Sequence, residues 1–303
     1  MAIILVRQIL QMFLLAGIGF LLYRGGKISQ EGSRALGNIL IYVSLPAVII
    51  NGFLVERDSA HVTGLLVSAG LALGLLLLSV VISHFLFRQD GVAAFASAFS
   101  NPGFFGIPLI IASVGQGAVF YVAMFVAFLN VGQWTYGVSR LTGQPVLKGF
   151  QPAKLIRAPF VIAILVGLLL FATRLPLPEP VRSCLSTAAG LNTPLAMFTV
   201  GIYLAQTDLK RMIRRKTVYA VAASRLMLIP LVALGLLSLL PAEMYEMKMA
   251  LLIAIACPVG SNVAVYAHLH GKDYGYGVET VVISTLLSIA TIPLLATLAQ
   301  AIW

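Results

Sequence analysis

The sequence predicts an all-α, polytopic membrane protein with ten transmembrane helices in two inverted five-helix repeats. Of its 303 residues, 60% are hydrophobic and 10% are charged, whereas an ordinary soluble domain is about 25% charged. Apolar stretches of bilayer-crossing length, about 20 residues, recur along the whole chain. Two of these stretches, one in each half, are interrupted near the middle by proline and glycine. These interruptions point to a paired functional site.

Ten candidate spans follow one another, with short polar loops between them. Most have the length that is needed to cross the hydrocarbon core as a helix. Their approximate limits are 2–23, 36–54, 62–87, 91–113, 117–139, 157–174, 182–204, 217–239, 247–268 and 277–300.

The positive charges predict how the spans are oriented. The loops after the odd-numbered spans carry 14 lysines and arginines, and the loops after the even-numbered spans carry 4. Because cytoplasmic loops are enriched in these residues, we expect a multi-pass protein of the inner membrane with both termini outside the cytoplasm. The net charge of +10 is spread over these short loops, so it is not read as a nucleic-acid surface.

The midpoint of the chain predicts where one repeat ends and the next begins. A polar segment at 141–156, expected to be a cytoplasmic linker, separates a first repeat at 1–140 from a second at 157–303. Five spans per half invert the second half relative to the first. The second and fourth spans of each half carry a proline-centred interruption, at Pro46, Pro102, Pro194 and Pro258. Matched interruptions of this kind are a sequence signature of the binding site of a secondary transporter.

The two strongest interruptions have a chemistry that suits a small anion. The first reads Asn101-Pro102-Gly103-Phe104-Phe105-Gly106-Ile107-Pro108, and the second reads Cys257-Pro258-Val259-Gly260-Ser261-Asn262. Proline removes a backbone donor and breaks the helix, so the following half-helix presents free N–H groups and a positive dipole end. Asn101, Asn262 and Ser261 add neutral hydrogen-bonding groups. If the two breaks cross, these side chains would face one central cavity.

These motifs resemble a known family. The first interruption, with Leu109, closely resembles the fourth-span signature of the auxin efflux carrier family, which includes bacterial members and the plant PIN carriers and lies in the bile/arsenite/auxin-type transporter superfamily. Thr193-Pro194-Leu195-Ala196-Met197 resembles its seventh-span signature. The second interruption, followed by Tyr266 and Gly271, is similar to its ninth-span pattern.

The resemblance implies a fold, a function and a site. It implies that broken helices 4 and 9 cross at the centre of the two repeats. It also implies alternating-access transport of an organic anion: a mono- or dicarboxylate such as malonate or malate, or an auxin-like acid. A scaffold of spans 1, 2, 6 and 7 would move against the other spans. The expected substrate-binding residues are Asn101, Pro102, Gly103, Gly106, Pro258, Gly260, Ser261 and Asn262.

Other polar residues within the spans are candidates for the cavity or for ion coupling. Asn130, Asn192 and Thr193 either line the cavity or join helices by hydrogen bonds. Arg225 is a counter-ion for the substrate or, as we favour, a side chain that reaches the membrane interface. Glu279 could bind a coupling proton or cation, but we expect it to cap the first turn of span 10.

Competing functions make different demands on the sequence. An intramembrane enzyme would need a motif such as H-E-x-x-H or a pair of aspartates within the spans, and the sequence has neither. We therefore expect no enzyme, no cofactor and no metal site. A channel or a transport-derived sensor of organic anions remains as the alternative. The expected partners are the substrate anion, a coupling proton or sodium ion and the lipid bilayer; a homodimer is allowed and nucleic acid is not expected.

Overall fold

The computed structural model describes residues 1–56, 58–146, 156–207 and 209–303, and these residues form helices joined by short loops. Most of the predicted linker at 141–156 lies outside the described residues. In the first half the helices are α1 (Ala2–Arg24), α2 (Gln30–Ile39), η1 (Leu40–Ser44), α3 (Leu45–Phe53), α4 (Ser59–Leu86), α5 (Gly91–Ala98), η2 (Pro102–Gly106), α6 (Ile107–Ser113), η3 (Gln116–Ala118), α7 (Val119–Gly132), η4 (Gln133–Gly137) and α8 (Val138–Thr142).

The second half is also helical throughout its described part. Its helices are α11 (Pro159–Thr173), α12 (Glu179–Gly190), α13 (Asn192–Gln206), α14 (Leu209–Arg214), α15 (Lys216–Ala223), η5 (Ser224–Leu228), α16 (Ile229–Leu237), η6 (Ala242–Met244), α17 (Tyr245–Ala256), α18 (Asn262–Leu269) and α19 (Tyr274–Ile302). The prediction of an all-α protein is therefore confirmed.

Seven helical segments in the described chain are long and apolar enough to cross a membrane. They are Ala2–Arg24, Gln30–Phe53, His61–Leu86, Gln116–Thr142, Glu179–Gln206, Lys216–Leu237 and Tyr274–Ile302. The other three predicted spans are not single long helices. Those at 91–113 and 247–268 are broken, and the one at 157–174 forms α11, which has 15 residues. A multi-pass membrane protein is thus supported by seven segments, and the full set of ten stays a prediction.

Each of four segments contains one π-helical turn, in which backbone N–H groups bond to the carbonyl oxygen five residues back instead of four. These turns are η1, η2, η4 and η5. Such turns rotate the side chains that follow and often occur at functional sites. At Pro46 the helix changes from η1 to α3 without separating, and near Pro194 the chain has only a single turn residue between α12 and α13. Only the breaks at Pro102 and Pro258 separate their helices fully.

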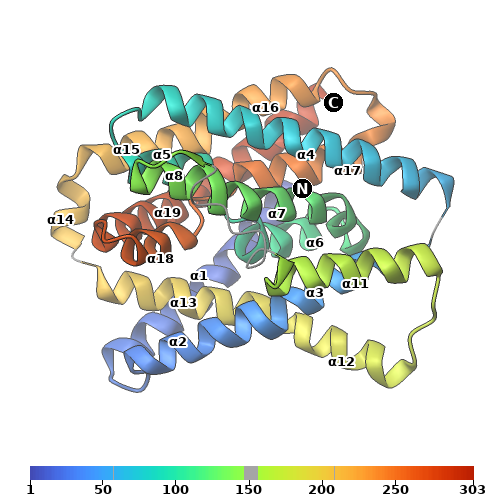
Figure 1. The fold of residues 1–303 in the computed structure, drawn as a ribbon, viewed down its shortest axis with the longest axis horizontal. Helices are drawn as coiled ribbons and strands as arrows, with labels where there is room; N and C mark the ends of the chain where they lie inside the picture. The colour runs from blue at the N-terminus through green and yellow to red at the C-terminus, as the bar shows by residue number, and fades with distance from the viewer. Residues whose placement is uncertain (57, 147–155, 208) are drawn as a thin grey trace.

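One group of helices packs around α1 and α3. Helix α1 lies along α13 over most of its length, and α3 packs on α11 and α12. In Figure 1, α2, α3, α11, α12 and α13 occupy the lower part of the molecule. The α1–α13 contact is close because Gly19 meets the backbone of Phe198 and Gly201 meets the backbone of Ala16.

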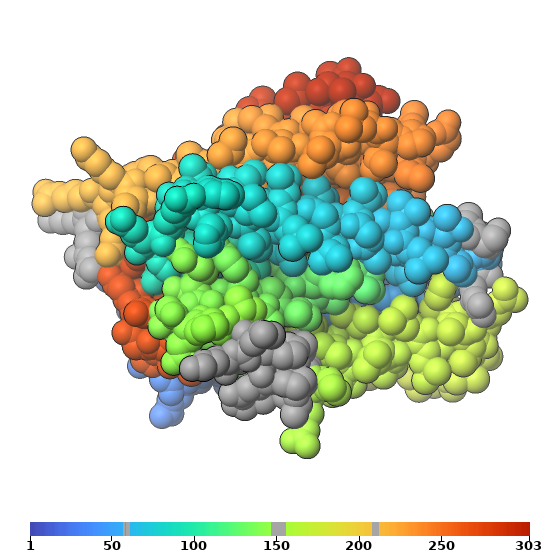
Figure 2. All heavy atoms as spheres, turned by 45° about the horizontal axis from the view of Figure 1, so that its top comes forward, coloured from blue at the N-terminus to red at the C-terminus, as the bar shows by residue number. Residues whose placement is uncertain are grey.

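The remaining long helices form a second group. Helix α4 packs on α5 and α7, α19 packs on α15 and α18, and α16 packs on α17. Figure 2 shows α4, in blue to cyan, lying across one face of the molecule. Large apolar side chains on α4 are exposed there, among them Leu66, Leu77 and Phe85. An exposed apolar helix face of this kind is what a lipid environment accommodates.

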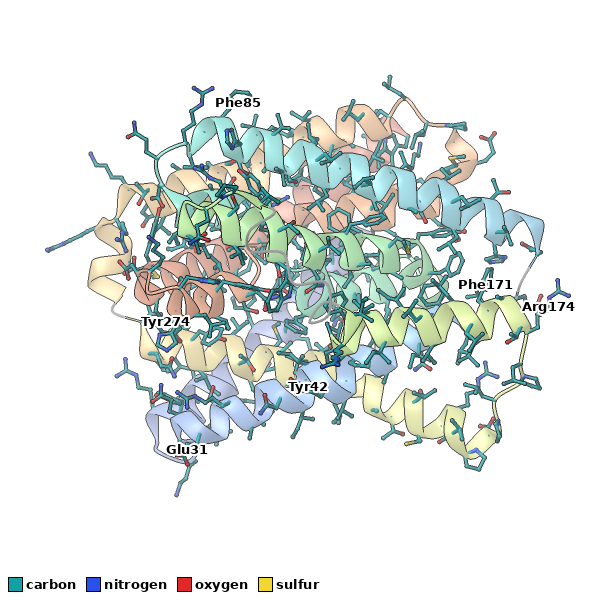
Figure 3. The ribbon with its side chains drawn as sticks, in the orientation of Figure 1. Glu31, Tyr42, Phe85, Phe171, Arg174 and Tyr274 are labelled. Carbon is teal, nitrogen blue, oxygen red and sulfur yellow. The ribbon has the colours of Figure 1, made fainter. Side chains whose placement is uncertain are left out.

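Polar contacts gather the charged loops at one end of the molecule. The Arg140 guanidinium donates to the carbonyl oxygen of Phe87 at 3.0 Å, and Arg215 lies 3.0 Å from Asp273. In Figure 3, Glu31 and Tyr274 lie towards one end and Arg174 lies at the opposite end. Because the Tyr276 hydroxyl also donates to Asp90 at 3.0 Å, the basic loops around residues 88, 215 and 272 lie together at one end.

Candidate functional site

The two broken helices cross in extended backbone. Ser100 and Val259 form an antiparallel β-bridge, and the N–H of Gly260 donates to the carbonyl oxygen of Phe99 at 3.0 Å. On the far side, the N–H of Val259 donates to the hydroxyl of Ser284 at 3.0 Å. These bonds satisfy backbone groups that could not be left facing lipid. The two breaks that the sequence predicted thus meet each other directly.

The crossing requires glycine at residue 260. A Cβ atom placed on Gly260 would lie 2.9 Å from the carbonyl oxygen of Ser100. A larger residue would push the two strands of the crossing apart. The glycine at this position is therefore explained by close backbone approach, not by an unusual φ.

A small cavity lies beside the crossing. Its water-accessible volume is about 40 Å³, and a water molecule needs roughly 10–15 Å³ of such space, so it has room for a few waters. It lies between the two breaks and the second half of α7. Its lining residues are Leu45, Ser100, Asn101, Pro102, Gly103, Phe104, Val126, Leu129, Asn130, Gln133, Gly260, Ser261 and Asn262.

The cavity is bordered by the starts of two half-helices. Asn101 precedes the helical segment from Pro102 to Ser113, and its carbonyl oxygen accepts from the N–H groups of Phe105 and Gly106, both at 3.1 Å. The Asn101 side chain makes no capping bond to that segment. Ser261 precedes α18 in the same way. Because the first N–H groups of a helix have no acceptor within it, both starts favour a negative charge in the cavity.

Two side-chain amides tie neighbouring helices to the breaks. The Nδ2 of Asn262 donates to the Oε1 of Gln133 at 2.9 Å, which joins α18 to η4. The Nδ2 of Asn192 donates to the carbonyl oxygen of Gly103 at 3.0 Å, which joins α13 to η2. Asn130 instead donates to the carbonyl oxygen of Val126 on its own helix, at 2.7 Å. All three asparagines thus lie at or beside the crossing.

Arg225 corrects one of the expectations from the sequence. It does not reach the membrane interface, because its exposed fraction is 0%. Its Nη1 donates to the carbonyl oxygens of Ser97 and Ala98, at 3.0 and 3.1 Å, and its Nη2 donates to the carbonyl oxygen of Ile255. These carbonyls end α5 and α17. Arg225 therefore binds the two negative helix ends at the crossing. The residues whose carbonyl oxygens it contacts are not among those that line the cavity.

Glu279 corrects a second expectation. The residue that caps α19 is Asp273, whose side chain accepts from the N–H of Tyr276 at 2.9 Å. Glu279 lies further along the helix, is 3% exposed and pairs with Arg215 at 3.0 Å. The loop arginine reaches this carboxylate because the end of α14 lies against the start of α19. Glu279 is thus an ion-pair residue near the charged end, away from the cavity.

The remaining predicted site residues divide between the cavity and its surroundings. Pro102, Gly103, Gly260 and Ser261 line the cavity. Gly106 faces α17, where an added Cβ would lie 2.8 Å from the sulfur of Cys257. Pro258 is buried in the extended segment.

Thr193 lies in a different place from the other predicted residues. It borders a second, larger pocket of about 680 Å³, which lies between α1, α3, α6, α12 and α13. That pocket is also lined by Asn51, Pro108, Gln116 and Arg182. The sequence left open whether Thr193 lines the central cavity, and the structure places it at this second pocket instead.

Sequence reasoning missed Gln133. This side chain is 1% exposed and bonds to Asn262 inside the cavity lining. A polar residue that follows a long apolar run was the available signal. The π-helical turn η4, which begins at Gln133, was not readable from the pattern of apolar residues. Over the described chain, no three residues among histidine, cysteine, aspartate and glutamate gather as metal ligands would.

Comparison with known proteins gives the family. The model of a family described as "Membrane transport protein" matches the chain twice, at residues 4–146 and 144–296. The chain belongs to this membrane transport protein family. The resemblance to auxin efflux carriers is thereby confirmed. A member of the family is expected to be a transporter and not an enzyme.

One curated relative of this membrane transport protein covers nearly all of it. The relative comes from Rhizobium meliloti (strain 1021), carries the name "Putative malonate transporter" and is 28% identical over 295 residues, 91% of each chain. The similarity extends through both breaks and the linker region, since it spans almost the entire sequence.

Proposed function

We propose that this chain is a secondary carrier that exchanges small organic anions, dicarboxylates such as malonate foremost, by alternating access. The observation that carries the proposal is the crossing itself. Two helix starts and the side chains of Asn101 and Asn262 border one cavity. Helix starts and neutral amides bind carboxylate groups without burying a positive charge next to the substrate.

The choice of substrate rests on charge and on the similar protein. The cavity lining contains side-chain amides and two serine hydroxyls but no carboxylate, so an anion meets no repulsion from an acidic side chain there. The Rhizobium meliloti relative is named for malonate. A cavity of about 40 Å³ is too small for a three-carbon diacid, so binding would require the helices around the crossing to separate.

The helix packing supports a way in which this separation could occur. Helices α1, α3, α11, α12 and α13 pack on one another, while α4, α5, α7 and α15 to α19 form the other group. The first group corresponds to spans 1, 2, 6 and 7, which the family resemblance implies to be the scaffold. The two family matches, at 4–146 and 144–296, meet within the linker that we propose as the boundary between two inverted repeats. Movement of the second group against the first would alternately open the cavity to each side.

The direct test is counterflow in proteoliposomes. Purified protein is reconstituted with unlabelled malonate inside, and uptake of labelled malonate is measured against a panel of mono- and dicarboxylates. We expect saturable exchange that is lost in empty liposomes and strongly reduced in the Asn101→Ala variant. A thermal unfolding transition shows that the purified protein is folded. If such protein exchanges none of the carboxylates, the carrier proposal is rejected.

A channel or a sensor is the second candidate. A channel needs a continuous polar path, whereas the cavity at the crossing is small and bounded by Leu45, Val126 and Leu129. The small size of this cavity favours a carrier. Currents through single proteins in planar bilayers, or malonate binding without any exchange, would instead identify a channel or a sensor.

A further inference from the structure

Arg225 is the most deeply buried charge in the described chain that has no carboxylate partner. It is 0% exposed, and the ion pairs among the described residues join other side chains. Its charge is balanced by backbone oxygens of Ser97, Ala98 and Ile255. A buried cation without such compensation would be very costly. These carbonyls therefore form a cation site, and the guanidinium fills it.

The site consists of two helix ends that come from different halves of the chain. Each carries roughly half a negative charge at its C-terminus, so together they offer about one negative charge. In transporters with broken helices, such carbonyl ends commonly coordinate the coupling sodium ion or proton. In this protein the same kind of end is bound by a side chain of the chain itself.

The surroundings hold this side chain in place. Ser224, the residue before Arg225, lies 2.9 Å from Ser97 between their hydroxyl oxygens, and Ser83 donates to Ser97 at 2.8 Å. The π-helical turn η5 begins at Ser224 and places both side chains against α5. Cys257 satisfies a further carbonyl of α17, donating to Ile253 at 3.1 Å. The carbonyl oxygens at these two helix ends thus accept hydrogen bonds from side chains of the protein itself.

We propose that Arg225 is a tethered cation that occupies the place of a coupling ion between the carbonyl ends of α5 and α17, so that the crossing requires no sodium. It acts as a positioning residue. It holds the two helix ends together and keeps their negative ends neutralised, while the positive helix starts stay available to the anion. It is not among the residues that line the cavity.

The first experiment measures stability, so it does not depend on the proposed function. Arg225→Ala leaves space and three carbonyls without a donor, and a guanidinium ion from solution fits both. We expect millimolar guanidinium chloride to raise the unfolding temperature of Arg225→Ala by several degrees over an equal concentration of N-methylglucamine chloride. The wild type should not respond. Arg225→Met is the matched control, because its side chain fills the space without a charge and should not respond either.

The outcomes of this experiment decide the proposal. Equal responses of Arg225→Ala and Arg225→Met, or none in Arg225→Ala, would overturn it. If Arg225→Ala does not fold, Arg225→Lys decides, because lysine keeps the charge on a compact group. Folding of the Lys variant but not of the Met variant supports the tethered cation. Folding of both contradicts it.

The second experiment measures exchange, and this arm alone rests on the proposed function. Wild-type malonate exchange should be unchanged when sodium is replaced by N-methylglucamine. A loss of exchange of tenfold or more on sodium removal would overturn the proposal while leaving the carrier function intact. Arg7→Ala, which removes an exposed arginine of α1, is the control for loss of a positive charge as such.

Discussion

Asn262 and Gln133 are joined by a hydrogen bond of 2.9 Å from Nδ2 to Oε1, at the edge of the central cavity. The two residues come from opposite halves of the chain. The bond fixes the orientation of the Asn262 side chain. The direction of its Oδ1 atom is therefore set by Gln133 and not by α18. This pair gives the first prediction.

We expect Gln133→Ala to reduce malonate exchange roughly three- to tenfold, since one buried hydrogen bond contributes about 1 kcal/mol. If the pair acts as a unit, Gln133→Ala and Asn262→Ala should not be additive, and a double-mutant cycle should give a coupling of about 0.5–3 kcal/mol. Gln116→Ala, at the larger pocket, is the control. Additive losses would mean that the two amides act independently.

Asn101 tests the sign of the substrate charge. Asn101→Ala should lower exchange with the fold retained, because a cavity-lining amide is lost. Asn101→Asp has nearly the same shape and adds a negative charge beside the substrate, so it should raise the KM for malonate well above that of the Ala variant. The measurement is a KM and rate comparison in proteoliposomes. A variant with aspartate that transports malonate better than the alanine variant would contradict an anion site here.

Gly260 tests the close contact of the two breaks. Gly260→Ala should destabilise the protein by about 1–3 kcal/mol, because its Cβ would lie 2.9 Å from the oxygen of Ser100. Gly235→Ala is the matched control, since a Cβ there meets nothing within 4 Å and alanine is preferred in a helix by about 0.5–1 kcal/mol. Thermal unfolding in detergent compares the two. A stable Gly260→Ala would show that the crossing can widen freely.

The Arg215–Glu279 pair tests whether Glu279 couples transport or supports the fold. Glu279→Gln removes one partner of a pair in which the carboxylate is 4% exposed and the arginine 29%. We expect a lower unfolding temperature, corresponding to about 1–3 kcal/mol, with exchange per folded protein retained. Arg214→Gln, which changes an exposed neighbour, should be near neutral. Lost exchange at an unchanged unfolding temperature would instead assign Glu279 a coupling role.

The predicted orientation is tested by two cysteines at opposite ends. Glu31 and Leu175, which follows Arg174, are both exposed, and Figure 3 places Glu31 and Arg174 at opposite ends. In a Cys184→Ser background, a membrane-impermeant maleimide should label Leu175→Cys in right-side-out vesicles. It should label Glu31→Cys only after the membrane is permeabilised. The reverse pattern would place both termini in the cytoplasm.

The sequence predicted the broken helices well because their signals are local. Proline and glycine within an apolar run mark Pro102 and Pro258 directly, and the structure brings these two breaks together. The partners of the crossing were less accessible. Arg225 was assigned to the interface because neither the turn at η5 nor the carbonyl ends that it binds can be read from residue types. Gln133 was missed for a related reason, since its partner lies in the other half of the chain.

Glu279 shows a limit of another kind. Its charge near the start of a span suggested a helix cap, but the helix begins earlier, at Tyr274, and Asp273 already caps it. A shift of a few residues in a helix boundary was enough to change the role of a buried carboxylate. Thr193 was a candidate for the cavity because it is a polar residue within a span, whereas the separate pocket that it borders is a tertiary feature.

The glycine contacts between α1 and α13 restrict how the protein can move. At Gly19 and Gly201 the two backbones touch without an intervening side chain. Neither helix can slide or roll past the other without a steric clash at these contacts, so the pair moves as one rigid unit. Any transport cycle must preserve the packing of α1 on α13. A crosslink that locks α1 to α13 should therefore cost no activity, whereas one that locks α1 to α19 should stop the carrier.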